Sequence, residues 1–269
     1  MAQPIIDAVI KLGGSVVTDK GSDRLTVRRD VVRRLAEEIG ASHLERLVLV
    51  HGAGSFGHRI VKRTGIDRGV EMPGALAAWA ETQRLQYVLA AEVAEICIGA
   101  GIPAIVCQAS ASARLRRGRL ESMEVEVVRA ILQQGGVPQL YGVPAVDAEQ
   151  GCAILSGDQI APFLAQRLGI GLVIHGTDVD GVFESDPALG PTARVPRIGR
   201  GNAAAVLAAL GGSAHVDVTG GMRGKVESLL QWAQHGVCAR IVDATRPGRL
   251  AQALAGEEVG TLVRWEEQP

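Results

Sequence analysis

The sequence lacks any pair of cysteines spaced as Cys-x-x-Cys. It has four cysteines among 269 residues, and they are scattered along the chain as Cys97, Cys107, Cys152 and Cys238. This scatter argues against both a zinc site and a disulfide framework. We therefore interpret the four cysteines as small core residues of a protein in a reducing compartment.

The sequence also has no excess of one charge and no long apolar run. Its 29 acidic and 28 basic residues give a net charge of −1, and a nucleic-acid partner would need a basic excess on one face. The longest apolar stretch, residues 203–210, is too short to span a bilayer, and the N-terminus has no basic segment followed by an apolar run. We expect a cytoplasmic protein whose partner is a small molecule, not nucleic acid or a membrane.

Lysine is scarce, because only Lys11, Lys20, Lys62 and Lys225 are lysines among the 28 basic residues. Genome base composition would account for this bias without any functional meaning. An arginine, however, cannot replace a compact ammonium where a point charge is needed. The three lysines in glycine-containing stretches are therefore candidates for a site, whereas Lys62 is predicted to lie on the surface.

Several catalytic motifs are missing. A P-loop is excluded because Thr219 stands five residues before Gly224 and Val226 follows Lys225. There is no His-Glu-x-x-His motif, and Ala53 replaces the first glycine of a Gly-x-Ser-x-Gly elbow. The chain is therefore not a P-loop enzyme, and nothing marks a hydrolase of these kinds.

The chain does contain a glycine-rich turn directly after an apolar strand. Residues 47–50 lead into a turn with Gly52, Gly54 and Gly57, which ends in His58. Closely spaced glycines let backbone N–H groups approach an oxyanion, so the turn predicts a phosphate site at which His58 donates. The letters also match a dinucleotide fingerprint, but no second strand ending in an acidic residue follows. A turn that needs glycine only for steric reasons is the plain alternative.

Apolar residues recur with strand and helix spacing in alternation. Strands are predicted at residues 5–10, 47–50, 102–107, 137–141, 171–175, 237–242 and 259–263, and a hairpin at 143–155. Helices are predicted at residues 27–39, 73–98, 122–135, 156–168, 201–210, 220–234 and 247–254, the third of them capped by Ser122. This alternation predicts an α/β fold with a mainly parallel sheet covered by helices on both faces. No linker divides the chain, so we expect a single domain over residues 1–269.

Three turns follow predicted strands, at residues 11–15, 51–58 and 176–181. Ligands of open α/β sheets bind beyond the carboxyl ends of the strands, so we expect these turns to share one cleft. Two glycine turns in one cleft predict two bound polyanions. The basic run 114–119 is instead interpreted as a solvated hairpin tip.

Six segments resemble, in order, the successive motifs of the amino acid kinase superfamily, and they cover essentially the whole chain. They are Lys11–Ser15, Asp19–Lys20, His51–His58, Ser156–Asp158, Thr177–Val182 and Gly220–Lys225. The ending Gly-Ser-Phe-Gly-His at residues 54–58 is similar to the archaeal-type isopentenyl phosphate kinase branch, with fosfomycin kinases as near relatives. The resemblance implies an open αβα sandwich that uses ATP to phosphorylate isopentenyl phosphate to the diphosphate.

The resemblance also implies roles for the matching residues. Lys11, Gly13, Gly14, Ser15 and Gly54 are expected to contact the ATP phosphates, and the nucleotide is expected to be held in the C-terminal half by Thr177, Asp178, Gly220 and Lys225. The acceptor phosphate is expected in the N-terminal half on Ala53, His58 and Gly157. Lys20 is expected to stabilise the transferring phosphoryl group. Mg²⁺ accompanying ATP and a homodimer are further implications, and no residue is assigned as a metal ligand.

Asp158 has two interpretations. A carboxylate in the first turn of a helix is stabilised by the helix dipole whatever else it does. In the functional interpretation it orients the lysines and amides, and it joins Lys11, Lys20 and His58 as a catalytic residue. Two departures from the family pattern bear on this: Ala53 stands where many relatives have glycine, and Gly142-Val143 stands where an aspartate is expected. The second departure leaves the acidic support of the site resting more on Asp158.

Three other functions stay open at this point: a kinase for another phosphate or phosphonate such as fosfomycin, a non-catalytic nucleotide or oxyanion store, and a dinucleotide-dependent oxidoreductase. Retention of Lys11, Lys20 and Lys225 argues against storage.

One face of the helix 73–98 and the remaining polar residues are given structural or open interpretations. The helix face made by Trp79, Gln83, Gln86 and Ala90 is interpreted as either the wall of a hydrocarbon-tail pocket or plain core. Residues interpreted as ordinary turn or structural residues are Asp180, Asp186, His43, His175, His215 and His235.

Overall fold

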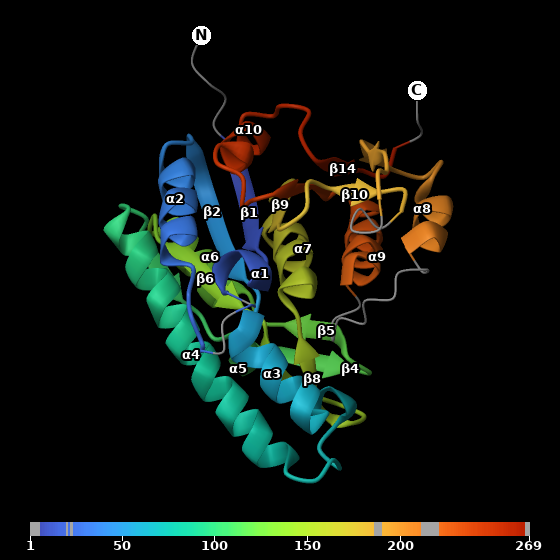
Figure 1. Cartoon of the computed structure of the whole chain (residues 1–269). Coiled ribbons are helices and arrows are strands. Elements are labelled where there is room, and N and C mark those ends of the chain that lie inside the picture. The colour runs from blue at the N-terminus through green and yellow to red at the C-terminus, as the bar shows by residue number, and fades with distance from the viewer. Residues whose placement is uncertain (1–5, 20, 22–23, 186–189, 211–220, 267–269) are drawn as a thin grey trace.

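An eight-stranded sheet forms the centre of the molecule (Figure 1). The structure is a computed structural model and describes residues 6–19, 21, 24–185, 190–210 and 221–266. The strands of the sheet, in spatial order, are β12 (Arg197–Ile198), β14 (Thr261–Val263), β13 (Cys238–Asp243), β9 (Leu172–Thr177), β1 (Ile6–Leu12), β2 (Leu44–His51), β6 (Val137–Tyr141) and β3 (Ala104–Val106). Every neighbouring pair is parallel except β13 and β14. The predicted mainly parallel sheet is confirmed.

Helices cover both faces of this sheet. The helices of the described chain are α1 (Gly14–Val17), α2 (Arg29–Gly40), α3 (Gly54–Thr64), α4 (Ala75–Gly99), α5 (Ala109–Ser112), α6 (Glu126–Gln133), α7 (Gly157–Leu168), α8 (Ala203–Leu210), α9 (Gly221–Ala233) and α10 (Arg249–Leu254), with a 3-10 turn at Ile66–Arg68. Side chains alternate along β1, so that Val9 packs in one buried cluster while Ala8 and Ile10 pack in the other. The predicted three-layer arrangement follows from this alternation.

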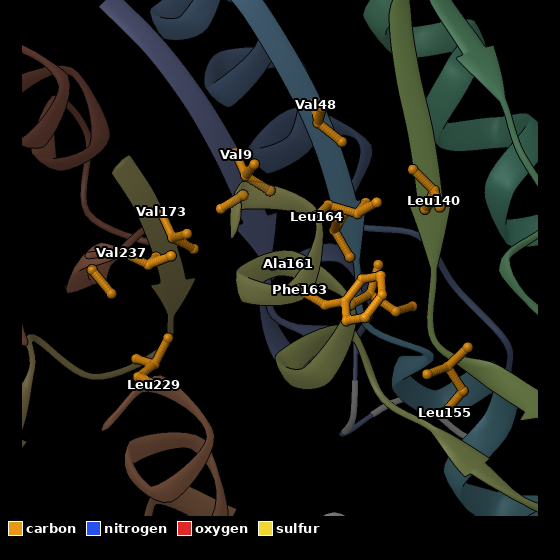
Figure 2. Packing of buried hydrophobic residues seen from close by; sticks show 14 of the residues in the cluster. Val9, Val48, Leu140, Leu155, Ala161, Phe163, Leu164, Val173, Leu229 and Val237 are labelled. Carbon is orange, nitrogen blue, oxygen red and sulfur yellow. The ribbon is translucent and has the colours of Figure 1, made fainter. Parts of the chain in front are cut away.

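Helix α7 fills the middle of one face. Figure 2 shows its Ala161, Phe163 and Leu164 against strand residues such as Val9 and Val48. Leu164 is fully buried. The other face is covered by α2, α4 and α10, whose apolar residues share a second cluster with β1 and β2. Helix α7 is thereby held rigidly, and its first turn has a fixed place at the edge of the sheet.

Two smaller sheets complete the fold. Strands β5 (Arg119–Met123), β4 (Ala113–Arg116), β7 (Val143–Asp147) and β8 (Gly151–Leu155) form one, and β10 (Val182–Phe183) and β11 (Arg194–Val195) form the other. The predicted hairpin is confirmed by the antiparallel pairing of β7 and β8. The basic run also lies at a hairpin tip, where Arg116 and Arg117 form ion pairs with Glu149.

The sequence prediction differs from the structure at α3 and α6, and the short helices α1 and α5 were not predicted either. Helix α3 was not predicted, although Phe56, Ile60 and Val61 are buried along it, because its glycine-rich beginning resembles a turn. Ser122 does not cap a helix. It lies in β5 opposite Arg114, and the helix begins at Glu126 with Val125 as its N-cap. The strand pairing, which no local pattern records, decides this position.

The register of the central strands places the three predicted turns at one edge. Leu12 at the end of β1 is opposite His51 of β2 and Gly176 of β9. The segments that begin at Gly13, Gly52 and Thr177 therefore leave the sheet side by side. Among the described helices, none combines the length and the apolar character that crossing a membrane requires.

Candidate functional site

A cavity of about 260 Å³ opens at this edge of the sheet. It is lined by the predicted residues Lys11, Gly13, Gly14, Ser15, Ala53, His58, Gly157, Asp158, Thr177, Asp178 and Lys225. Gly54 lies directly behind this wall, packed against Gly14. The predictions for Lys20 and Gly220 concern positions outside the described residues. The cavity also has lining residues that the sequence did not predict, namely Gly52, Gly142, Ile154, Ser156, Val179, Gly221 and Met222.

The two glycine turns are in direct backbone contact. A Cβ added to Gly14 would lie 2.5 Å from the backbone nitrogen of Gly54, and one added to Gly52 would lie 2.6 Å from that of Gly14. Gly54 also has a left-handed φ of +52°, which side chains other than glycine rarely adopt. The glycines are therefore required for steric reasons and also border the cavity, so the two interpretations of this turn do not exclude each other.

Helices α3 and α7 begin at the cavity, at Gly54 and Gly157, and α1 and α9 begin there too, at Gly14 and Gly221. Neither N-cap residue, Ala53 or Ser156, makes a side-chain capping hydrogen bond. The first N–H groups of a helix and its dipole attract anions. Ala53 retains its backbone N–H despite departing from the family pattern, and His58 stands in the second turn of α3 with its side chain at the cavity. These helix ends suit phosphate oxygens.

One carboxylate oxygen joins two lysines below the cavity. The Nζ atoms of Lys11 and Lys225 each lie 2.7 Å from Oδ1 of Asp158. These side chains are all nearly buried, at 6%, 9% and 13% exposure for Lys11, Lys225 and Asp158. Asp158 thus has partners in β1 and α9, so its place in the first turn of α7 is not explained by the helix dipole alone. Two ammonium groups share one carboxylate, which leaves an excess positive charge.

Burial and charge shift the pKa values of this cluster in opposite directions. Burial alone would raise the pKa of Asp158, but the charges of Lys11 and Lys225 outweigh it and hold that pKa well below its usual range. Burial lowers the pKa of Lys11 to about 8, against the opposing effect of Asp158. The carboxylate is therefore ionised at neutral pH, and Lys11 loses its proton at a lower pH than an exposed lysine does.

His175 is a site residue that the sequence analysis assigned to a structural role. It lies on β9 opposite Lys11, is fully buried, and has its Nδ1 3.2 Å from Oδ1 of Asp158. Burial lowers its pKa to about 4, so the ring is neutral near pH 7. No sequence signal marks it, because it stands inside an apolar strand. Its contact with Asp158 depends on the register of β1 and β9.

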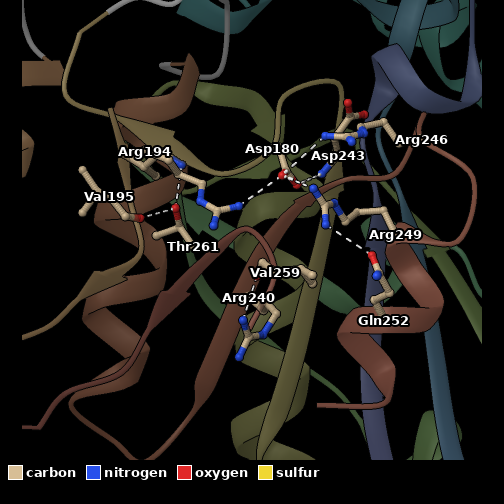
Figure 3. A network of polar contacts seen from close by, with 11 residues as sticks. Asp180, Arg194, Val195, Arg240, Asp243, Arg246, Arg249, Gln252, Val259 and Thr261 are labelled. Atoms are coloured by element: carbon tan, nitrogen blue, oxygen red, sulfur yellow. Dashed lines mark hydrogen bonds and ion pairs between the residues drawn. The ribbon is translucent and has the colours of Figure 1, made fainter. Parts of the chain in front are cut away.

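The turn after β9 is anchored by arginines. Asp180 does not line the cavity. Its Oδ2 lies 2.6 Å from Arg249 and 3.2 Å from Arg194, and Figure 3 shows these side chains converging on it. Within the turn itself, the hydroxyl of Thr177 donates to the carboxylate of Asp178. Asp180 is therefore a turn residue, as predicted, that also fixes the wall of the cavity formed by residues 177–179.

The α4 face that was interpreted as either a pocket wall or plain core is not part of this cavity. None of Trp79, Gln83, Gln86 and Ala90 lines the cavity. Helix α3 packs against α4, and Gln86, fully buried, reaches only the carbonyl oxygen of Ala53, at 3.3 Å. Apolar lining comes instead from Ile154 of β8 and Met222 of α9. At the second departure from the family pattern, Gly142 lines the cavity and Val143 is buried.

Comparison with known proteins gives consistent matches. Residues 8–243 match the amino acid kinase family. The isopentenyl phosphate kinase of Methanothermobacter thermautotrophicus is 38% identical over 262 residues, which are 95% of this chain and 98% of that protein. That of Methanocaldococcus jannaschii is 29% identical, over 96% and 99% of the two chains. An X-ray structure of an isopentenyl phosphate kinase superposes with a TM-score of 0.82 at 34% identity, covering 95% of this chain and 99% of the other.

Replacing Asp158 with asparagine tests the central ion cluster. The change leaves two buried ammonium groups without a counter-charge, so Asp158→Asn is expected to lower the free energy of unfolding by about 3–5 kcal/mol. Urea denaturation at neutral pH measures this. Asp30→Asn is the matched control, because the Asp30 side chain is fully exposed. Equal stability of the two variants would contradict a structural role for the cluster.

Proposed function

Because the chain belongs to the amino acid kinase family, we propose that it transfers the γ-phosphoryl group of ATP to isopentenyl phosphate, giving ADP and isopentenyl diphosphate. One observation carries the proposal: two glycine turns in backbone contact border a single cavity in which two buried ammonium groups share one carboxylate oxygen. Such a cavity suits two phosphate-bearing ligands placed next to each other. The full-length similarity to isopentenyl phosphate kinases supports this choice of acceptor.

ATP occupies the C-terminal side of the cavity in this proposal. Its phosphates lie along the first glycine turn, on Gly13, Gly14 and Ser15, with Gly54 beside them. Lys11 and Lys225 supply positive charge, and Thr177 and Asp178 hold the nucleotide. Gly220 is assigned to the nucleotide as well, and Lys20 to the transferring phosphoryl group. The whole chain acts as a single domain, with the acceptor in its N-terminal half.

The acceptor phosphate lies on Ala53, His58 and Gly157. These residues place it at the N-termini of α3 and α7, where first-turn N–H groups favour an anion. His58 donates to a phosphate oxygen from the second turn of α3. Ile154, on the same cavity wall, provides an apolar surface for the hydrocarbon tail. A tail of isopentenyl size needs no ion-pairing partner there.

The proposed reaction depends chiefly on position and charge. Phosphoryl transfer needs an in-line approach and neutralisation of the migrating group, with little covalent work by the protein. The acceptor is a phosphate monoester with a second pKa of about 6, so it is already a nucleophilic anion and requires no strong general base. Asp158 holds Lys11 and Lys225 in place and keeps them charged. With valine at position 143, this task rests more on Asp158.

Mg²⁺ is proposed to enter with ATP. Within the described ranges no three His, Cys, Asp or Glu side chains are grouped to hold a metal ion. In kinases Mg²⁺ keeps several waters and binds largely through substrate phosphates. When bound, the ion neutralises phosphate charge. The four unpaired cysteines agree with the cytoplasmic, reducing setting that we propose.

We also propose a homodimer built on the β3 edge of the sheet. In the described chain β3 pairs only with β6, and its Ile105 and Val106 are 46% and 42% exposed. Tyr87 and Ile98 of the neighbouring α4 are also exposed. An uncovered apolar strand edge is typical of an interface.

Light scattering should give twice the 28.2 kDa chain mass. Ile105→Glu should give the monomer. Leu76→Glu is the control, because Leu76 lies at the other end of α4, and this variant should remain a dimer. A monomeric parent chain would contradict the proposal.

The choice of acceptor is tested by ADP release with a panel of acceptors. Isopentenyl phosphate is expected to give the highest kcat/KM among isopentenyl phosphate, fosfomycin, glutamate, aspartate and carbamate. Lys11→Ala should abolish most of the turnover, whereas Lys62→Ala, which removes an exposed lysine, should not. If another acceptor gives a kcat/KM about tenfold higher, which corresponds to about 1.4 kcal/mol, the assignment of isopentenyl phosphate as the substrate is wrong. ATP binding without any turnover would indicate a storage protein.

Activity is expected to fall above about pH 8, because the Lys11 pKa is about 8 in the free protein. Below this pH the ammonium attracts ATP, and above it the charge is lost, so kcat/KM for ATP should decrease. Bound phosphate raises the pKa again, so the fall in kcat should come at higher pH. Rate profiles for the parent and for Lys11→Arg, which stays charged, measure this. Identical profiles for kcat and kcat/KM would contradict the assignment of Lys11.

A further inference from the structure

The hydroxyl of Thr18 joins the two glycine turns. Thr18 is 1% exposed and comes directly after α1. Its Oγ1 donates to the carbonyl oxygen of Gly14 at 2.8 Å and accepts the backbone N–H of Ser55 at 3.0 Å. Gly14 belongs to the first turn and Ser55 to the second. One side-chain atom therefore bridges the two segments that border the cavity.

The bridge needs a group that donates and accepts from the same atom. A hydroxyl has one hydrogen and two lone pairs, so it satisfies both backbone groups at once. A Cβ atom added to Gly54 would lie only 2.2 Å from the same oxygen, so the Thr18 side chain also fills the space beside this glycine. Valine has nearly the same shape as threonine but can make neither hydrogen bond.

The backbone around Thr18 is itself fixed. Its N–H donates to the carbonyl oxygen of Gly14 at 3.0 Å, and it forms an antiparallel bridge with Val27. Asp19 then donates to Thr26 across the same bridge. These backbone hydrogen bonds therefore fix the position from which the Thr18 hydroxyl extends. The hydroxyl fixes the first turn of α3 in relation to the first glycine turn.

We propose that Thr18 is a positioning residue for phosphoryl transfer: its hydroxyl sets the distance and angle between the ATP turn and the acceptor turn. This inference rests on the proposed function, because it assumes a phosphate donor on the first turn and an acceptor on the second. Each turn has its own contacts to its ligand. Loss of the bridge therefore leaves binding nearly intact and disturbs the in-line approach, to which the rate is far more sensitive.

The test compares three variants of the full chain. Thr18→Val removes both hydrogen bonds, and Thr18→Ser retains the hydroxyl. Thr64→Val is the matched control, because the Thr64 hydroxyl bonds only to Ile60 within the far end of α3. For each variant, calorimetry gives the affinity and stoichiometry for isopentenyl phosphate and for a non-hydrolysable ATP analogue, and steady-state rates give kcat per competent site. Should Thr18→Val not yield folded protein, Thr18→Cys replaces it, since a thiol is a weak donor and acceptor.

Thr18→Val is expected to lower kcat at least about tenfold, with each ligand bound within about threefold of the parent affinity. Thr18→Ser and Thr64→Val should stay within about threefold in every quantity. The inference is overturned if Thr18→Val keeps the parent kcat, if Thr18→Ser falls as far as Thr18→Val, or if the loss lies wholly in the affinity for one ligand.

The parent chain separates this inference from the proposed function. If it releases no ADP with isopentenyl phosphate, the proposed acceptor is wrong. The same variants are then compared with whichever acceptor of the panel the parent does phosphorylate, and the three outcomes above keep their meaning.

Discussion

The ion cluster of Lys11, Asp158 and Lys225 is the interaction on which the site depends. It joins β1, α7 and α9, with His175 of β9 as a fourth neighbour, so distant parts of the chain meet at one carboxylate oxygen. The cluster is under-compensated, because one negative charge faces two ammonium groups in a buried setting. Burial is the main cause of the lowered pKa of Lys11, and the neighbouring charge of Lys225 adds to it. A bound polyphosphate would supply the missing negative charge, so the same feature that makes the empty cluster costly favours nucleotide binding.

The second constraint is the backbone contact between the two glycine turns. Gly14, Gly52 and Gly54 approach so closely that no side chain fits between them, and Thr18 bridges the contact from below. The ammonium groups of Lys11 and Lys225 lie at the N-terminus of α7, against Asp158, and the N-terminus of α3 borders the same cavity. The fold thus supports two anionic ligands in fixed relation to each other. This relation is what a transfer reaction needs and what a simple anion store does not.

Much of this arrangement could be predicted from sequence, and the exceptions have physical reasons. The layers of the fold follow from apolar spacing, and Lys11 and Lys225 were recognisable because lysine is rare and stands beside glycine. His175 was missed because its role arises from the register between β1 and β9. The α4 face does not reach the cavity, and α3, whose glycine-rich start hid it from prediction, packs against α4. Local patterns predict elements well, whereas contacts between strands and the order of packed helices are decided by the whole fold.

Calorimetric titration of His58→Ala tests the division of the cavity most directly. If the second glycine turn holds the acceptor, the variant should bind isopentenyl phosphate about tenfold or more weakly, corresponding to the ~1–3 kcal/mol of a hydrogen bond to a charged group. Its affinity for an ATP analogue should match that of the parent chain and of His43→Ala, which alters an exposed histidine. Weaker nucleotide binding with unchanged acceptor binding would contradict the account, because it would reverse the assignment of the two turns.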